Sequence, residues 1–86
     1  MADEPVDAEA LAQQLAGFDV GQFVVAAAST LASLAFAKLD QGNLPQAKHA
    51  IDTLASLMPH VEGELEADLG RALVSLQVAY ASAASA

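Results

Sequence analysis

Residues 43–59 read NLPQAKHAIDTLASLMP and decide the fold, because they carry the start, the periodicity and the end of one helix. Asn43 is a favourable N-cap, Pro45 suits the first helical turn, and Gln46 takes the third helical position of a capping box. Apolar residues then recur at steps of four, three and four, at Ala47, Ile51, Leu54 and Met58. This period predicts an amphipathic helix over about 44–58 that ends at Pro59.

Helix signals also lie on the N-terminal side of this segment. Asp19 and Gln22 have the spacing of a second capping box, and Gly42 suits the left-handed position that follows a helix. Together they predict a long helix over about 19–39. A shorter helix over about 8–16, with one weak apolar stripe, is expected to precede it, and a helix of that length is unstable alone in water.

The C-terminal third of the chain shows the same helical period. Its apolar stripe consists of Leu65, Leu69, Leu73, Leu76 and Tyr80. This stripe predicts a last helix over about 64–81, and no strand pattern occurs anywhere. The fold class is therefore all-α, a small helical bundle of three main helices and a short N-terminal helix. We expect one helical domain over 7–81, a disordered acidic tail at 1–6 and a frayed Ala/Ser tail at 82–86.

The composition excludes several classes of function. The chain has 86 residues, 11 acidic and three basic, so its formal net charge is −8, and it has no cysteine. A chain this short forms one domain. Nucleic-acid binding requires a basic surface, which these few scattered bases do not supply. Without cysteine, disulfides and thiolate zinc sites are excluded. A reducing cytoplasm is the expected location, since no positively charged secretory segment begins the chain.

One uncharged stretch has almost the length of a membrane span. Residues 20–37 carry no acid or base, and about 20 apolar residues are needed to cross a bilayer. The stretch contains Gly21, Gln22, Ser29, Thr30 and Ser33, and much of the remainder is alanine, which is nearly neutral for insertion. We therefore expect a buried helix of a water-soluble protein rather than a membrane span.

The same helix has more apolar surface than a small bundle can cover. One side carries Val24, Ala28, Leu31 and Ala35, and a second side carries Val25, Ser29, Ala32 and Phe36, with Phe23 and Leu34 beside it. A helix that is apolar all round is normally buried all round, so we expect a homo-oligomer, with a dimer favoured. The residues expected at its interface are Val25, Ser29, Ala32, Ser33, Phe36, Val74 and Val78. The alternative is that the short first helix folds over this surplus.

The predicted hairpin resembles a single tetratricopeptide repeat, a helical hairpin of about 34 residues. The residues that match its pattern, over about 28–59, are Leu31, Leu34, Ala35, Gly42, Ala47, Ile51 and Pro59. The chain departs from that pattern where Trp, Gly and Tyr are usual, and no second copy follows. The resemblance implies a groove for a partner helix or peptide, with ligand-facing positions at Ser29, Ala32, Phe36 and Leu39.

A second resemblance covers about residues 23–80. Asn43-Leu44-Pro45-Gln46-Ala47-Lys48 followed by Ile51-Asp52, together with the turn Gly63-Glu64-Leu65, resembles a bacterial family known as domain of unknown function 1844. The chain departs from it in a shorter connection before Asn43, a shorter last helix, and Pro59-His60 in place of charged residues. The resemblance implies a bacterial source and brings no catalytic residue. It also implies that Asn43 and Asp52 recur in the family.

Candidate chemical groups are few. His49 and Asp52 are three residues apart on one helix, but two groups do not make a metal site, and the acids at 62–68 lack a calcium-loop pattern. We expect no catalytic residue, no metal and no cofactor. Lys48 and Asp52 have the spacing of a weak ion pair. Asn43 is explained as a cap, whereas Asp52 is not, which makes Asp52 the candidate contact with a partner.

These features predict a non-enzymatic, acidic helical protein that self-associates through its second helix and acts as a scaffold or adaptor. The alternative prediction is a tetratricopeptide-like module that binds a partner helix or peptide in an apolar groove formed by Val25, Phe36 and Leu39.

Overall fold

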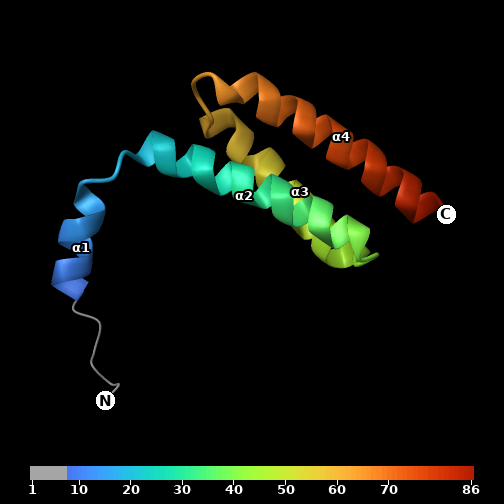
Figure 1. The fold of residues 1–86 in the computed structure, drawn as a ribbon, viewed down its shortest axis with the longest axis horizontal. Helices are drawn as coiled ribbons and strands as arrows, with labels where there is room; N and C mark the ends of the chain where they lie inside the picture. The colour runs from blue at the N-terminus through green and yellow to red at the C-terminus, as the bar shows by residue number, and fades with distance from the viewer. Residues whose placement is uncertain (1–7) are drawn as a thin grey trace, which may run out of the picture.

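The computed structural model describes residues 8–86, which form helices and short connections and contain no strand (Figure 1). The helices are α1 (Ala8–Ala16), α2 (Val20–Asp40), α3 (Leu44–Leu57) and α4 (Leu65–Ser85), with a 3₁₀ turn η1 (Met58–His60) after α3. The predicted all-α bundle of three main helices and a short N-terminal helix is confirmed. The tail predicted at 1–6 lies outside the described residues.

The turn between α2 and α3 has the hydrogen bonds that its sequence predicts. Gly42 has a positive φ of 74°, and its N–H donates to the Leu39 carbonyl at 3.0 Å. The Asn43 N–H donates to the Lys38 carbonyl at 2.9 Å, which completes a Schellman motif. The Asn43 side-chain oxygen then accepts from the Gln46 N–H at 3.3 Å and starts α3. The chain thus reverses direction within three residues, and α2 and α3 lie antiparallel (Figure 1).

The two later helices end at different positions from those predicted. α3 ends at Leu57 and the chain continues as η1, because Pro59 has no N–H to donate to the preceding turn. α4 begins at Leu65 and continues to Ser85, which takes it into the predicted frayed tail. Alanine has the highest helix propensity, and the Ser85 hydroxyl donates to the Ala81 carbonyl at 2.9 Å.

The core lies where α2, α3 and α4 meet. Its buried residues are Ala28, Ala32, Ala35, Ala50, Ile51, Leu54, Val61, Leu69 and Leu76. Every residue that α2 buries is an alanine, so α2 approaches α3 and α4 closely, while the larger side chains come from those two helices and, for Val61, from the connection between them. The predicted core stripes of α3 and α4 are confirmed, except that Leu65 is exposed.

Helix α1 stands apart from the bundle. It extends away from the N-terminal end of α2 (Figure 1), contacts no other described helix and has no buried residue. Asp19 sits between the two helices in an extended conformation, and its carboxylate accepts from the Gln22 N–H at 3.0 Å. This cap fixes the direction in which the chain enters α2. The alternative in which α1 folds over the apolar surplus of its own chain is therefore not what the structure shows.

Candidate interaction surface

The side of α2 that points away from α3 and α4 is exposed and uncharged. Ala26 and Thr30 lie two residues on either side of buried Ala28, and a two-residue step turns a helix by about 200°. Ser33 and Ala37 likewise lie two residues before and after buried Ala35. We call this surface the outer face of α2. Its exposed residues are Phe23, Ala26, Thr30, Ser33, Leu34 and Ala37.

Some of the residues predicted to form the interface are packed within the chain, and others are exposed. On α2, Ala32 is only 8% exposed and Val25 packs against the core. Ser29 is half-buried and Phe36 is exposed at the edge of the packed side. Only Ser33 lies on the outer face. The reason is that α2 contacts both α3 and α4, so its packed side extends into the second predicted stripe as far as Val25 and Ala32.

The two predicted interface residues of α4 lie on a separate surface. Val74 and Val78 are exposed, and they lie two residues before and after the buried Leu76. By the same helical geometry they point away from the core, and therefore away from α2. We call the exposed residues Ala67, Val74, Val78 and Ala81 the outer stripe of α4. This stripe and the outer face of α2 therefore lie on different helices, and each points away from the core that the helices share.

The apolar groove expected for a partner peptide is largely used by the chain itself. Val25 and Leu39 pack against the core cluster, and Ala32 between them is buried. Phe36 is the exposed member of this set. Packing within the chain therefore occupies most of the surface on which that alternative function depends.

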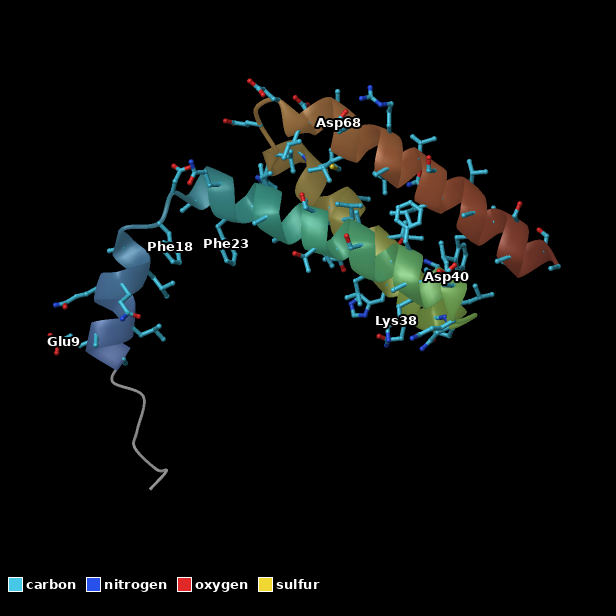
Figure 2. All side chains as sticks on the ribbon, viewed as in Figure 1. Glu9, Phe18, Phe23, Lys38, Asp40 and Asp68 are labelled. Atoms are coloured by element: carbon cyan, nitrogen blue, oxygen red, sulfur yellow. The ribbon has the colours of Figure 1, made fainter. Side chains whose placement is uncertain are left out.

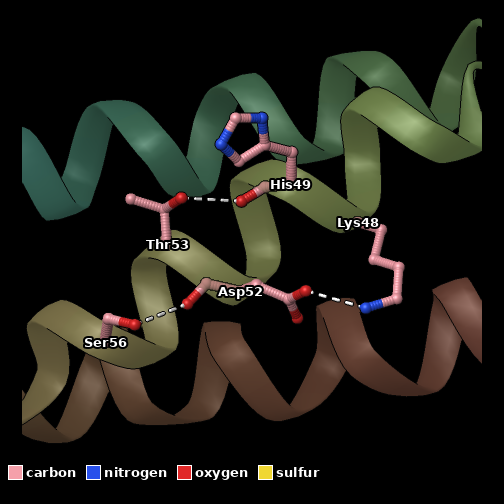
Figure 3. A network of polar contacts seen from close by, with 5 residues as sticks. All are labelled: Lys48, His49, Asp52, Thr53 and Ser56. Carbon is pink, nitrogen blue, oxygen red and sulfur yellow. Dashed lines mark hydrogen bonds and ion pairs between the residues drawn. The ribbon is translucent and has the colours of Figure 1, made fainter.

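Polar contacts along α3 give Asp52 a structural partner (Figure 3). The Lys48 ammonium donates to the Asp52 carboxylate at 2.8 Å, which forms the ion pair that the spacing predicts. This hydrogen bond and the negative charge of Asp52 raise the pKa of Lys48 above its ordinary value of 10.5. Asp52 thus has a partner within its own helix, although its side chain remains 62% exposed. Its contact with a partner stays a prediction.

The other candidate chemical groups do not come together. Figure 3 shows the His49 ring and the Asp52 carboxylate directed to different sides of α3. His49 borders a hollow with Leu31 and Leu34, whereas Asp52 borders one with Tyr80. Within residues 8–86, no three His, Asp or Glu side chains are grouped in a way that could hold a metal ion.

Two exposed aromatic residues are missing from the interface that the sequence predicts. Phe18 and Phe23 are each 61% exposed and border a shared hollow at the bend between α1 and α2. Figure 2 shows both rings directed to the same side of the chain. The spacing of Phe23, Ala26, Thr30 and Leu34 is helical and could have indicated this face. Only the positions of α3 and α4, however, show that it is the side left uncovered.

The length and composition of α2 also meet the criteria for a membrane span. Among the described helices it is long and apolar enough to cross a bilayer, judged by those two properties alone.

Comparison of the chain with protein-family models, with curated proteins and with solved structures finds no match in any of the three. The two family resemblances of the sequence therefore remain predictions.

Proposed function

We propose that the protein is a non-enzymatic helical interaction module that self-associates through the outer face of α2 and serves as a scaffold or adaptor. The outer face of α2 carries this proposal, because it leaves Phe23 and Leu34 exposed on a helix without an acid or base from Val20 to Ala37. Exposed apolar patches on small proteins are typical of protein interfaces. The small residues Ala26, Ser33 and Ala37 on this face allow a second helix to approach closely.

Charge also favours this face for self-association. Two copies of a chain with net charge −8 repel each other, and the repulsion is smallest where the facing surfaces carry no charge. The outer face of α2 meets that condition. On α3 and α4, by contrast, the exposed surfaces include Lys48, Asp52, Asp68 and Arg71, and the last two form an ion pair.

A bilayer would cover the outer face of α2 less favourably than a second protein copy. α3 lies alongside α2 and carries Lys48, His49 and Asp52. If α2 crossed a membrane, these groups would be drawn toward the hydrocarbon region, where charged side chains are costly. Thr30 and Ser33 would also face lipid. A water-soluble dimer requires neither.

The test is Ser33→Glu, which places a charge at the centre of the outer face and changes nothing in the core. We expect the variant to remain helical and to raise the dimer dissociation constant at least about 100-fold, because a buried carboxylate without a partner is costly. Size-exclusion chromatography with light scattering at several concentrations measures the mass. Ala32→Glu is unsuitable, since Ala32 belongs to the core.

The matched control is Ser75→Glu, which adds the same charge at an exposed helical position on α4, four residues after Arg71. This control should leave the dimer unchanged. A wild-type chain that stays monomeric, or a Ser33→Glu variant with an unchanged dissociation constant, would contradict the proposal. Flotation of the wild-type chain with neutral phosphatidylcholine vesicles would show that the face meets lipid instead.

A further inference from the structure

Within residues 8–86, helix α1 is formed but packs against none of the other helices. It contacts no other described helix, and Leu11 and Leu15, one turn apart on one face, are 45% and 49% exposed. A helix of nine residues is not stable in water by itself, because helix nucleation is costly and few hydrogen bonds compensate for it. A stable α1 therefore requires a surface that covers Leu11 and Leu15.

The chain also offers a surface that matches this helix. Nine residues of helix are about 14 Å long, and the outer face of α2 from Phe23 to Leu34 extends over about 17 Å. Both surfaces are uncharged and carry exposed apolar side chains, and both are left uncovered by the bundle. The hollow bordered by Phe18 and Phe23 lies where they join, at the bend that follows α1.

We propose that α1 is an exchanged arm: in the dimer, the α1 helix of each copy packs Leu11, Leu15 and Phe18 against the outer face of α2 of the other copy. This inference rests on the proposed self-association and names the segment that completes it. A twofold exchange satisfies both unpartnered surfaces at once, and exchange of an identical element is a common route to a dimer.

The connection between α1 and α2 favours exchange over packing within one chain. Only Gly17, Phe18 and Asp19 separate the two helices, and the Asp19 carboxylate caps α2 with the backbone extended. Folding α1 back onto its own α2 would need a different backbone conformation at Asp19. That change would disturb the hydrogen bond by which the Asp19 carboxylate caps α2. A short, constrained hinge of this kind favours exchange between copies.

The exposed area is sufficient for a stable dimer. An aromatic side chain offers roughly 150–250 Å², and Phe18 and Phe23 are each 61% exposed. These two residues alone therefore present roughly 200–300 Å² on each copy. A specific interface needs about 1,000 Å² in total, or about 500 Å² from each copy. Leu11, Leu15 and Leu34 supply the remainder, and none of the five residues brings a charge to the contact.

Paired double variants of α1 test the arm. Leu11→Glu/Leu15→Glu places two charges on its apolar face, whereas Gln13→Glu/Gln14→Glu adds the same two charges to other exposed positions of the same helix. We expect the first variant to raise the dimer dissociation constant at least about 100-fold and the second to change it less than about threefold, since the leucines are buried in the contact and the glutamines are not.

Intermolecular paramagnetic NMR shows where α1 lies. The chain has no cysteine, so Thr30→Cys creates a single site for a nitroxide label on the outer face of α2. Labelled chains are mixed with ¹⁵N-labelled wild-type chains, so that signal loss reports contacts between copies only. The amides of residues 10–16 should lose intensity. Loss confined to α2, with α1 unaffected, would overturn the exchanged arm.

The two proposals fail in different ways. If Ser33→Glu breaks the dimer while Leu11→Glu/Leu15→Glu leaves it intact, self-association through α2 stands and the exchanged arm is wrong. If the wild-type chain is a monomer at every concentration, both proposals are wrong.

Discussion

The Asp52 side chain is on the surface, and its structural partner lies within its own helix. Its carboxylate accepts a hydrogen bond from Lys48, and its backbone carbonyl accepts one from the Ser56 hydroxyl at 3.1 Å. Both groups of the ion pair are mostly exposed, and such pairs contribute little to folding. The pair nevertheless orients the carboxylate toward the hollow that Tyr80 borders, between α3 and α4.

Asp52→Asn should lower the pKa of Lys48 toward its ordinary value, because the variant removes the charge that stabilises the ammonium. A lysine with a raised pKa in the folded state stabilises that state below pH 10.5, and this contribution is lost as the pH rises through the raised value. NMR titration of the Lys48 side chain measures the change. Asp68→Asn, which removes the partner of Arg71, is the control and should leave the Lys48 titration unaltered. Identical titrations in wild type and Asp52→Asn would contradict the assignment.

At the scale of single helices, the sequence predicts where α2 and α3 begin and where the chain turns between them, because those signals are local. Asp19 and Asn43 accept from the backbone N–H three residues later, and Gly42 has the left-handed conformation, as their positions predict. The end of α4 is less predictable, since fraying and the high propensity of alanine nearly balance. The predicted end near 81 considers only the apolar stripe, whereas the helix continues to Ser85.

The candidate surface could be predicted only in part, because it depends on how the helices are placed. The sequence shows that α2 has more apolar surface than one contact uses. Its packed side becomes known only when α3 and α4 are placed, and they cover Val25 and Ala32 while leaving Phe23 and Leu34 exposed. The separation of α1 from the bundle likewise has no local sequence signal.

Two glycine substitutions test the local account of the helices in opposite directions. Gly42→Ala should lower the free energy of unfolding by about 1–2 kcal/mol, because alanine is strained at a φ of 74° while its methyl group meets nothing within 4 Å. Gly70→Ala, in the interior of α4 and equally free of contacts, should raise it by about 0.5–1 kcal/mol. Urea denaturation followed by circular dichroism measures both. A change of the same sign in the two variants would show that backbone conformation is not the cause.

At the scale of the whole molecule, the bundle has two separate surfaces with exposed apolar side chains. The outer face of α2 and the outer stripe of α4 lie on different helices, and each points away from the shared core. A dimer formed through α2 would therefore keep the Val74 and Val78 side chains of both copies exposed at its two ends. Such a dimer has the geometry of a building block for larger assemblies, in which contacts through α4 join one dimer to the next.

Val78→Glu should leave the dimer intact and abolish association beyond it. The wild-type mass should rise above that of a dimer at high protein concentration, and more strongly at high salt, because salt screens the repulsion between chains of net charge −8. The variant should remain a dimer under the same conditions, since its added carboxylates meet at the α4 contact. Light scattering over a series of protein and salt concentrations separates the two steps. If Val78→Glu dissociates the dimer itself, then α4 and not α2 forms the primary contact, and the outer face of α2 becomes the secondary one.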